Sequence, residues 1–158
     1  MIYFLALFIG MVAGLRAMVA AAAVGWGAYL GVLALTGTWL SFLNSIWVVG
    51  LLTLLAVAEL VTDQLPSTPS RTVPLQFAAR VVMGALAGAA LGAGFGVWTG
   101  GLAAGAIGAV AGTLGGSAVR AGLAKALRND TPAALIEDAV AIIGAWLIIN
   151  AVTVVAIA

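Results

Sequence analysis

The chain has 158 residues, of which 65% are hydrophobic and 7% are charged, and its mean hydropathy is +1.26. Soluble domains carry about 25% charged residues. The six basic and five acidic side chains of this chain cannot cover a water-facing surface, and this excludes a soluble globular protein and a disordered chain. The net charge of +1 excludes a nucleic-acid binder, and the absence of His and Cys excludes Cys–His metal sites, disulfides and thiolate or imidazole catalysis. We therefore predict an integral membrane protein.

The first 35 residues are apolar apart from Arg16. A straight helix of that length would extend for about 50 Å, which is too long for one crossing of the membrane. We therefore expect the helix to break at Gly14-Leu15-Arg16, with a full span over residues 16–35. Residues 2–13 would then form a tilted span, a re-entrant half-helix or an interfacial helix. A cleaved signal peptide is not expected, because no basic segment precedes the apolar stretch and the stretch does not stop.

Four further apolar stretches are long enough to cross the hydrocarbon core. They are residues 39–61, 77–98, 99–119 (running on towards Leu127) and 133–158. Short uncharged turns at 36–38 and 98–101 indicate tight hairpins. Polar connections lie at 63–76 and 125–131, and the second ends in Asp130-Thr131-Pro132, a pattern typical of a helix N-cap. The sequence predicts one transmembrane domain over residues 1–158, an all-α bundle of five to six membrane-embedded helices.

The charged residues fall on one side of this predicted bundle. Two spans separate the two polar connections, so both lie on the same side of the membrane, and tracing the chain back puts Arg16 there too. The other basic residues of this side are Arg71, Arg80, Arg120, Lys125 and Arg128, and its acidic residues are Glu59, Asp63, Asp130, Glu137 and Asp138. By the positive-inside rule, this side is cytoplasmic.

The candidate site consists of charged side chains in or near the bilayer, where an ionisable group is costly and functional by default. Glu59 and Asp63 lie four residues apart and share a helix face, whereas Glu137 and Asp138 point about 100° apart, so at most one of these two is expected to face the same site. The expected partners of these carboxylates are Arg16, Arg80 and Arg120. One interpretation is a cytoplasm-facing polar cavity that binds a proton or cation. The alternative is a set of structural ion pairs, or Arg snorkelling to headgroups. Solvated loop charges are expected at Arg71, Arg128 and Asp130.

Glycine and alanine dominate residues 84–122, with a small residue at every fourth position from Gly84 to Gly96. Such faces let membrane helices pack closely, within a chain or in a homo-oligomer, and a glycine-lined pathway is the alternative. The segment after Arg16 aligns passably with that after Arg80, and a carboxylate pair follows each Arg two helices later. This suggests an inverted repeat of three helices per half, residues 1–70 and 71–158.

Several short motifs along the chain resemble a known family. They are Gly14-Leu15-Arg16-Ala17, Glu59-Leu60-Val61-Thr62-Asp63-Gln64-Leu65-Pro66, Gln76-Phe77-Ala78-Ala79-Arg80, Arg120-Ala121-Gly122-Leu123 and Leu135-Ile136-Glu137-Asp138. Over most of its length the chain resembles the bacterial domain-of-unknown-function family 4126, which implies a small multi-span inner-membrane protein and no particular activity. In the family pattern, Pro follows the Gly-Leu-Arg element and Lys follows the Asp, where this chain has Val19 and Gln64.

Three functions are compatible with the sequence. The favoured one is a small transporter or channel for a solute or ion, with a proton or cation as first choice, although the arginines leave an anionic solute or lipid headgroup open. The second is a non-transporting scaffold or assembly protein that packs through Gly- and Ala-rich faces. The third, an intramembrane enzyme acting on a lipid through carboxylates or a carboxylate-held metal, lacks a catalytic motif, so we expect no enzyme and no cofactor. The expected partners are the lipid bilayer, the small solute or ion, and a second copy of the chain.

Overall fold

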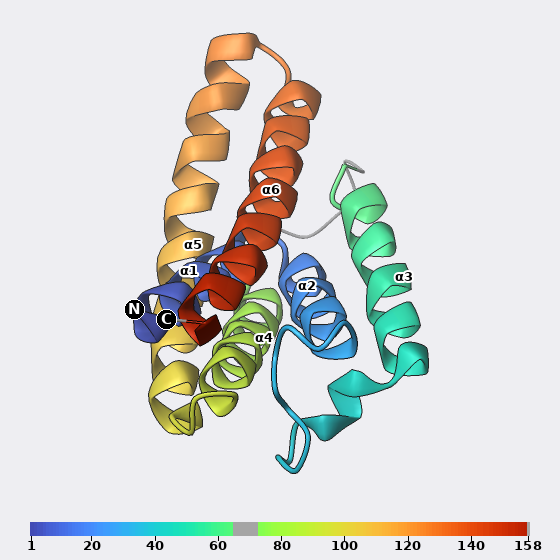
Figure 1. The fold of residues 1–158 in the computed structure, drawn as a ribbon. Helices are drawn as coiled ribbons and strands as arrows, with labels where there is room; N and C mark the ends of the chain where they lie inside the picture. The colour runs from blue at the N-terminus through green and yellow to red at the C-terminus, as the bar shows by residue number, and fades with distance from the viewer. Residues whose placement is uncertain (65–72, 158) are drawn as a thin grey trace.

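The structure is a computed structural model that describes residues 1–64 and 73–157, and this part of the chain is helical and contains no strand (Figure 1). The predicted all-α fold is therefore confirmed. The helices are α1 (Ile2–Leu15), α2 (Ala17–Tyr29), the short 3₁₀ helix η1 (Ser41–Asn44), α3 (Ile46–Thr62), α4 (Pro74–Ala93), α5 (Trp98–Leu127) and α6 (Asp130–Ile157).

Three of these helices, α4, α5 and α6, are long and apolar enough to cross a membrane. The apolar helices α1, α2 and α3 contain 14, 13 and 17 residues. At 1.5 Å per residue they extend for roughly 20–26 Å, less than the ~30 Å of a hydrocarbon core. The structure thus contains fewer helices of full span length than the five to six embedded helices predicted.

The predicted break of the first helix is confirmed. Helix α1 ends at Leu15, Arg16 has an extended backbone with φ −141° and ψ 101°, and α2 begins at Ala17. The predicted span over residues 16–35 is too long, because α2 ends at Tyr29.

The predicted span over residues 39–61 begins too early, since residues 30–45 form turns and η1 before α3 starts at Ile46. Gly31 and Gly37 have φ values of +76° and +80°, a left-handed conformation that suits glycine and breaks a helix. Similarly, Gly96, with φ +71°, lies in the turn before α5, so the hairpin predicted at residues 98–101 falls a few residues earlier.

The start of α6 also differs from its prediction. Asp130 is the first helical residue, and the Asn129 side chain Oδ1 caps the helix by accepting a hydrogen bond of 3.1 Å from the Thr131 N–H. Pro132 lies in the first turn as predicted. Asn129 takes the capping role because it is the residue that directly precedes the helix, while the Asp130 carboxylate binds an arginine of α5.

The glycine faces pack α1, α4 and α5 against one another within the chain. A Cβ added to Gly88 would overlap the backbone of Gly101 and Gly105 in α5, and one added to Gly108 would overlap Leu7 in α1. Small residues thus allow backbone-to-backbone contact. The close packing predicted from the glycine pattern is present, and in the structure it joins helices of one molecule.

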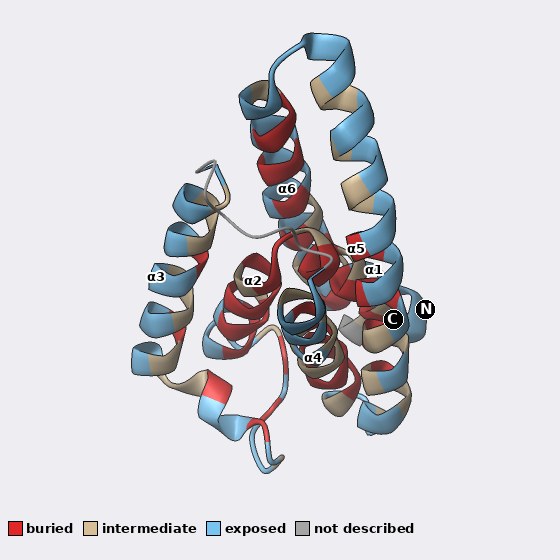
Figure 2. Cartoon of the chain, turned by 180° about the vertical axis from the view of Figure 1, so that it is seen from behind, coloured by how far each residue is buried: buried red, intermediate tan, exposed pale blue. Residues whose placement is uncertain are grey.

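The outer surface is strongly apolar, with Trp47 86% exposed and Leu54 66% exposed on α3. Figure 2 shows buried residues concentrated in the centre and α3 exposed along most of its length. Contiguous exposed apolar surface of this kind is rare on soluble monomers and is suited to contact with lipid. In Figure 1 the α5–α6 hairpin extends beyond the other helices.

The two halves of the predicted inverted repeat have three α-helices each but differ in size. The helices of the first half contain 14, 13 and 17 residues, and those of the second contain 20, 30 and 28. Arg16 lies in a helix break, whereas Arg80 lies inside α4. The inverted repeat is therefore not confirmed and stays a prediction.

Candidate functional site

The C-terminal end of α1 is buried, and its free carbonyl groups are bound by two side chains. Arg80 Nη1 donates hydrogen bonds to the carbonyl oxygens of Gly14, at 3.2 Å, and Leu15, at 2.5 Å. The Thr113 hydroxyl, which is fully buried, lies 3.3 Å from the Gly14 oxygen. The last carbonyl groups of a helix carry partial negative charge, so a guanidinium group is favourable here.

The N-terminal end of α2 is capped by the Glu59 side chain. Its Oε1 accepts a hydrogen bond of 2.9 Å from the Ala17 N–H, and its Oε2 accepts one of 2.8 Å from the Met18 N–H. The first N–H groups of a helix carry partial positive charge, which a carboxylate stabilises. The two ends of the helix break are thus each satisfied by a side chain of the favourable sign.

Arg16, in the break itself, is completely buried and binds carboxylates of two other helices. Its Nη1 forms an ion pair with Asp63 Oδ2, and its Nε donates a hydrogen bond of 2.5 Å to Asp138 Oδ1. Its Nη2 lies 4.0 Å from Glu137 Oε2 and makes no hydrogen bond within the described residues. The Gln64 side-chain amide donates to the second oxygen of Asp138 at 3.3 Å.

Glu137 and Asp138 therefore both face the same site, and the expectation that at most one would do so is wrong. The two carboxylates do diverge on α6, but the guanidinium group of Arg16 reaches between them from the neighbouring helix break.

Arg80 and Arg120 extend this network on either side of Arg16. Arg80 Nη2 lies 3.5 Å from Asp63 Oδ2, so Asp63 is shared between Arg16 and Arg80. Arg120 Nη1 lies 3.4 Å from Glu137 Oε2, and its Nη2 donates to the Asp63 carbonyl oxygen at 3.3 Å.

Asp130 is 62% exposed, as expected for a solvated charge, but it is the first residue of α6 and not part of a loop. Both of its oxygens also accept hydrogen bonds from Arg120, at 3.1 and 2.7 Å. The pairing forms because the short α5–α6 turn folds Asp130 back over Arg120. Arg128 is exposed as expected, and Arg71 lies outside the described residues.

The structure brings all seven predicted site residues into one network, here called the charge cluster. Its members are Arg16, Arg80, Arg120, Glu59, Asp63, Glu137 and Asp138, together with the additional residue Asp130. Within the described residues, three guanidinium groups thus face five carboxylates. No group of acidic residues within the described part of the chain has the arrangement of a metal site.

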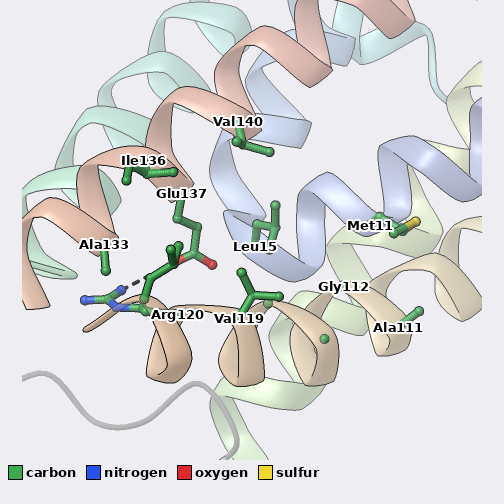
Figure 3. Close-up of a pocket in the computed structure, with 13 residues that line it drawn as sticks. Met11, Leu15, Ala111, Gly112, Val119, Arg120, Ala133, Ile136, Glu137 and Val140 are labelled. Atoms are coloured by element: carbon green, nitrogen blue, oxygen red, sulfur yellow. Dashed lines mark hydrogen bonds and ion pairs between the residues drawn. The ribbon is translucent and has the colours of Figure 1, made fainter. Parts of the chain in front are cut away.

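Two cavities border the charge cluster. The polar cavity, of about 300 Å³, lies between α2, α3 and α4, and its polar lining residues are Glu59, Thr62, Asp63, Gln76 and Arg80. The apolar cavity, of about 340 Å³, lies between α1, α5 and α6, and Arg120 and Glu137 are its charged lining residues (Figure 3). The cluster therefore lies between a cavity that several polar side chains line and a cavity that mainly apolar side chains line.

The family described as Domain of unknown function (DUF4126) matches residues 3–158. The chain belongs to the DUF4126 family. No curated protein and no solved structure matches it.

Three residues of the site in this DUF4126 chain were not predicted from the sequence: Thr113, Asp130 and Gln64. The sequence does indicate Asp130, because the short turn between two antiparallel helices places it near Arg120. For Thr113 the sequence offers only a polar side chain within an apolar, Gly-rich helix. Gln64 was noted as a departure from the family pattern, and the structure places it against Asp138.

Proposed function

We propose that this protein is a small integral membrane transporter or channel that moves a proton or a cation by way of the charge cluster. The observation that carries the proposal is the network of five carboxylates and three guanidinium groups among the described residues, in which Arg16 is fully buried. Ionisable groups at membrane depth are costly and mark ion and proton pathways. Carboxylates that share an arginine can exchange that partner for a proton or a cation, which is the step the proposal needs.

The polar cavity supplies a route to this charge. It brings a space of about 300 Å³ to Glu59, Asp63 and Arg80, and a cavity of this size with several polar side chains in its lining has room for water. Hydrated ions and protons can then reach two of the carboxylates without crossing an apolar barrier.

The broken helix is the second supporting feature. Discontinuous helices place partial charges and irregular backbone at membrane depth, and transporters use them to bind ions near the bilayer midplane. In this chain both ends of the break are held by charged residues of the cluster. A change in the charge of the cluster would therefore act directly on the helix break.

The proposal includes a location and an orientation. We place the protein in a bacterial inner membrane, with five to six helices embedded and the charged end of the bundle in the cytoplasm, as the positive-inside rule favours. The two three-helix halves would be the inverted repeat. We assign it no enzymatic activity, and a second copy of the chain remains an expected partner.

Proton or cation flux into proteoliposomes tests the proposal. We expect Asp63→Asn and Glu137→Gln each to lower the flux by roughly tenfold, because each removes a negative charge that binds the transported ion. Lys125→Gln, a charge change at an exposed residue outside the cluster, is the matched control and should leave the flux unchanged. Flux no greater than in protein-free liposomes, or flux unaffected by both variants, would instead support a cluster of purely structural ion pairs.

A further inference from the structure

Helix α6 has two different faces along its apolar part. One face packs on the bundle through the buried residues Ala141, Ala145, Ile148 and Val152. The opposite face is exposed, so that buried and exposed residues alternate around the helix (Figure 2). The exposed face is therefore available to a partner outside the molecule.

The residues along the middle of this exposed face form a heptad pattern, here called the α6 seam. They follow one another in alternating steps of four and three residues, and they are Ile136, Val140, Ile143, Leu147, Asn150 and Val154. The five apolar members are 46–65% exposed. Ile136 and Val154 are 18 residues apart, which is five full turns, so the seam stays on one side of the helix for about 27 Å. This is close to the thickness of the hydrocarbon core, and the spacing is the one by which two parallel helices interdigitate.

Asn150 distinguishes the seam from a face that only contacts lipid. It is exposed and lies within the apolar span of α6. Its Nδ2 donates a hydrogen bond of 2.8 Å to the Trp146 carbonyl oxygen, one turn earlier, and among the described residues its side chain makes no other. A carboxamide has a second N–H group and an acceptor oxygen to satisfy, and lipid tails offer no partner for either. The exposed amide therefore calls for a polar partner at this depth.

We propose that the α6 seam binds the α6 seam of a second copy of the chain, with the Asn150 carboxamides of the two copies hydrogen-bonded to each other. Copies of one membrane protein insert with the same orientation, so a cyclic assembly has its axis along the membrane normal and its α6 helices are parallel and in register. Asn150 then faces Asn150. The partial charges are complementary, because the amide oxygen of one copy accepts a hydrogen bond from the NH₂ group of the other. Such a polar residue at one seam position fixes the register of paired helices, and Asn joins membrane helices in this way.

The glycine-rich faces of α4 and α5 are not available for the same purpose. Gly88 lies against the backbone of Gly101 and Gly105, and Gly108 lies against that of Leu7, all within one molecule. The inference thus gives the expected second copy a different surface. It goes beyond transport, since the seam can pair whether or not the protein moves an ion.

Sedimentation equilibrium of the full-length protein in a mild detergent tests the inference. We expect reversible self-association, and Asn150→Leu should weaken it by roughly tenfold, a difference of about 1.4 kcal/mol. Leucine favours a membrane helix, so this variant should fold, and Asn150→Gln, which keeps the carboxamide, should retain most of the association. A chain that stays monomeric at all concentrations, or equal association of Asn150→Leu and the unmodified protein, would overturn the inference and leave this face to lipid or to a different protein.

Disulfide trapping in the membrane locates the contact. The chain has no Cys, so a single substitution reports on one position. Leu147→Cys, at a seam residue that is 54% exposed, should give a covalent dimer on oxidation. Leu114→Cys is the matched control, because Leu114 is 52% exposed but lies on α5, and it should give none. Equal trapping at the two positions, or trapping at Leu114→Cys alone, contradicts the inference.

These measurements involve no flux, so they separate the inference from the proposed function. Association through the seam without flux in proteoliposomes supports the inference and rejects transport. Flux from a protein that shows no association and no trapping at Leu147→Cys supports transport and rejects the inference.

Discussion

The guanidinium group of Arg80 lies 3.6 Å from the carboxylate of Glu59, and the two side chains bind opposite ends of the same helix break. Arg80 binds the carbonyl end of α1 and Glu59 binds the N–H end of α2. The ion pair therefore joins the two caps, so that the break is held by charges supplied from α3 and α4.

Replacing Glu59 tests the capping role. Glu59→Gln leaves one acceptor oxygen for two backbone N–H groups and removes the charge that the helix dipole favours, so we expect a loss of about 1–2 kcal/mol in the free energy of unfolding. The measurement is equilibrium unfolding in a denaturing detergent. Lys125→Gln, a charge change at an exposed residue outside the cluster, is the control and should change stability by less than about 0.5 kcal/mol. An unaltered midpoint for Glu59→Gln would mean that the cap contributes nothing.

Replacing Arg80 should have a larger effect. Arg80→Met removes the cation from the Gly14 and Leu15 carbonyl oxygens and from Glu59, and it leaves Asp63 with Arg16 alone. We expect a loss of about 3–5 kcal/mol, as found when one partner of a buried pair is removed. The same unfolding measurement applies. Arg128→Met, at an exposed residue, is the control, and a similar loss in both variants would contradict a specific role for Arg80.

The close contact between α4 and α5 predicts a strong effect of side-chain volume. Gly88→Leu would force its side chain into the backbone at Gly101 and Gly105, so we expect destabilisation by about 3 kcal/mol or more and little monodisperse protein in detergent. Gly50→Leu is the matched control, because a Cβ at Gly50 on α3 meets open space. If Gly88→Leu instead gives a folded protein that has lost only self-association, the glycines serve assembly, as the scaffold hypothesis requires.

The position of Gln64 offers a way to change the charge of the cluster. Its amide donates to Asp138 at 3.3 Å, so Gln64→Lys would add a positive charge beside a carboxylate of the cluster. We expect greater stability and a flux in proteoliposomes reduced by roughly tenfold, because the lysine competes with the transported cation. Gln64→Met, which removes the hydrogen bond without adding charge, should not reduce the flux. Equal flux in Gln64→Lys and the unmodified protein would contradict a cation site at the cluster.

That these charged residues lie together could be expected from the sequence, for a physical reason, whereas their role in binding a solute stays a prediction. In a chain with so little charge, an arginine within an apolar stretch requires carboxylate partners, and few are present. The break at Arg16 followed from helix length alone, because 35 apolar residues exceed one crossing.

The less accurate predictions concern features that depend on tertiary contacts. Residues 30–45 are mostly apolar, so the sequence predicts that they belong to membrane spans, yet Gly31 and Gly37 form turns there. In the same region the ring of Trp39 packs edge-on against that of Trp98, with 5.9 Å between the ring centroids. Polarity separates helix from loop in a soluble protein, but apolar turns near a membrane give no such signal. Likewise, the spacing of Glu137 and Asp138 on α6 carried no information on Arg16, which approaches from another helix.

The glycine contacts also determine which parts of the molecule can move. Helices α1, α4 and α5 touch backbone to backbone, so none of them can slide or rotate without a clash. Helix α3 has only Val49 and Ala56 buried and lies at the edge of the bundle, on the far side of α2 from α5 (Figure 1). Widening of the polar cavity is therefore open to α3 and not to α4, and Asp63 at the C-terminal end of α3 would separate from Arg16 and Arg80 as α3 moves.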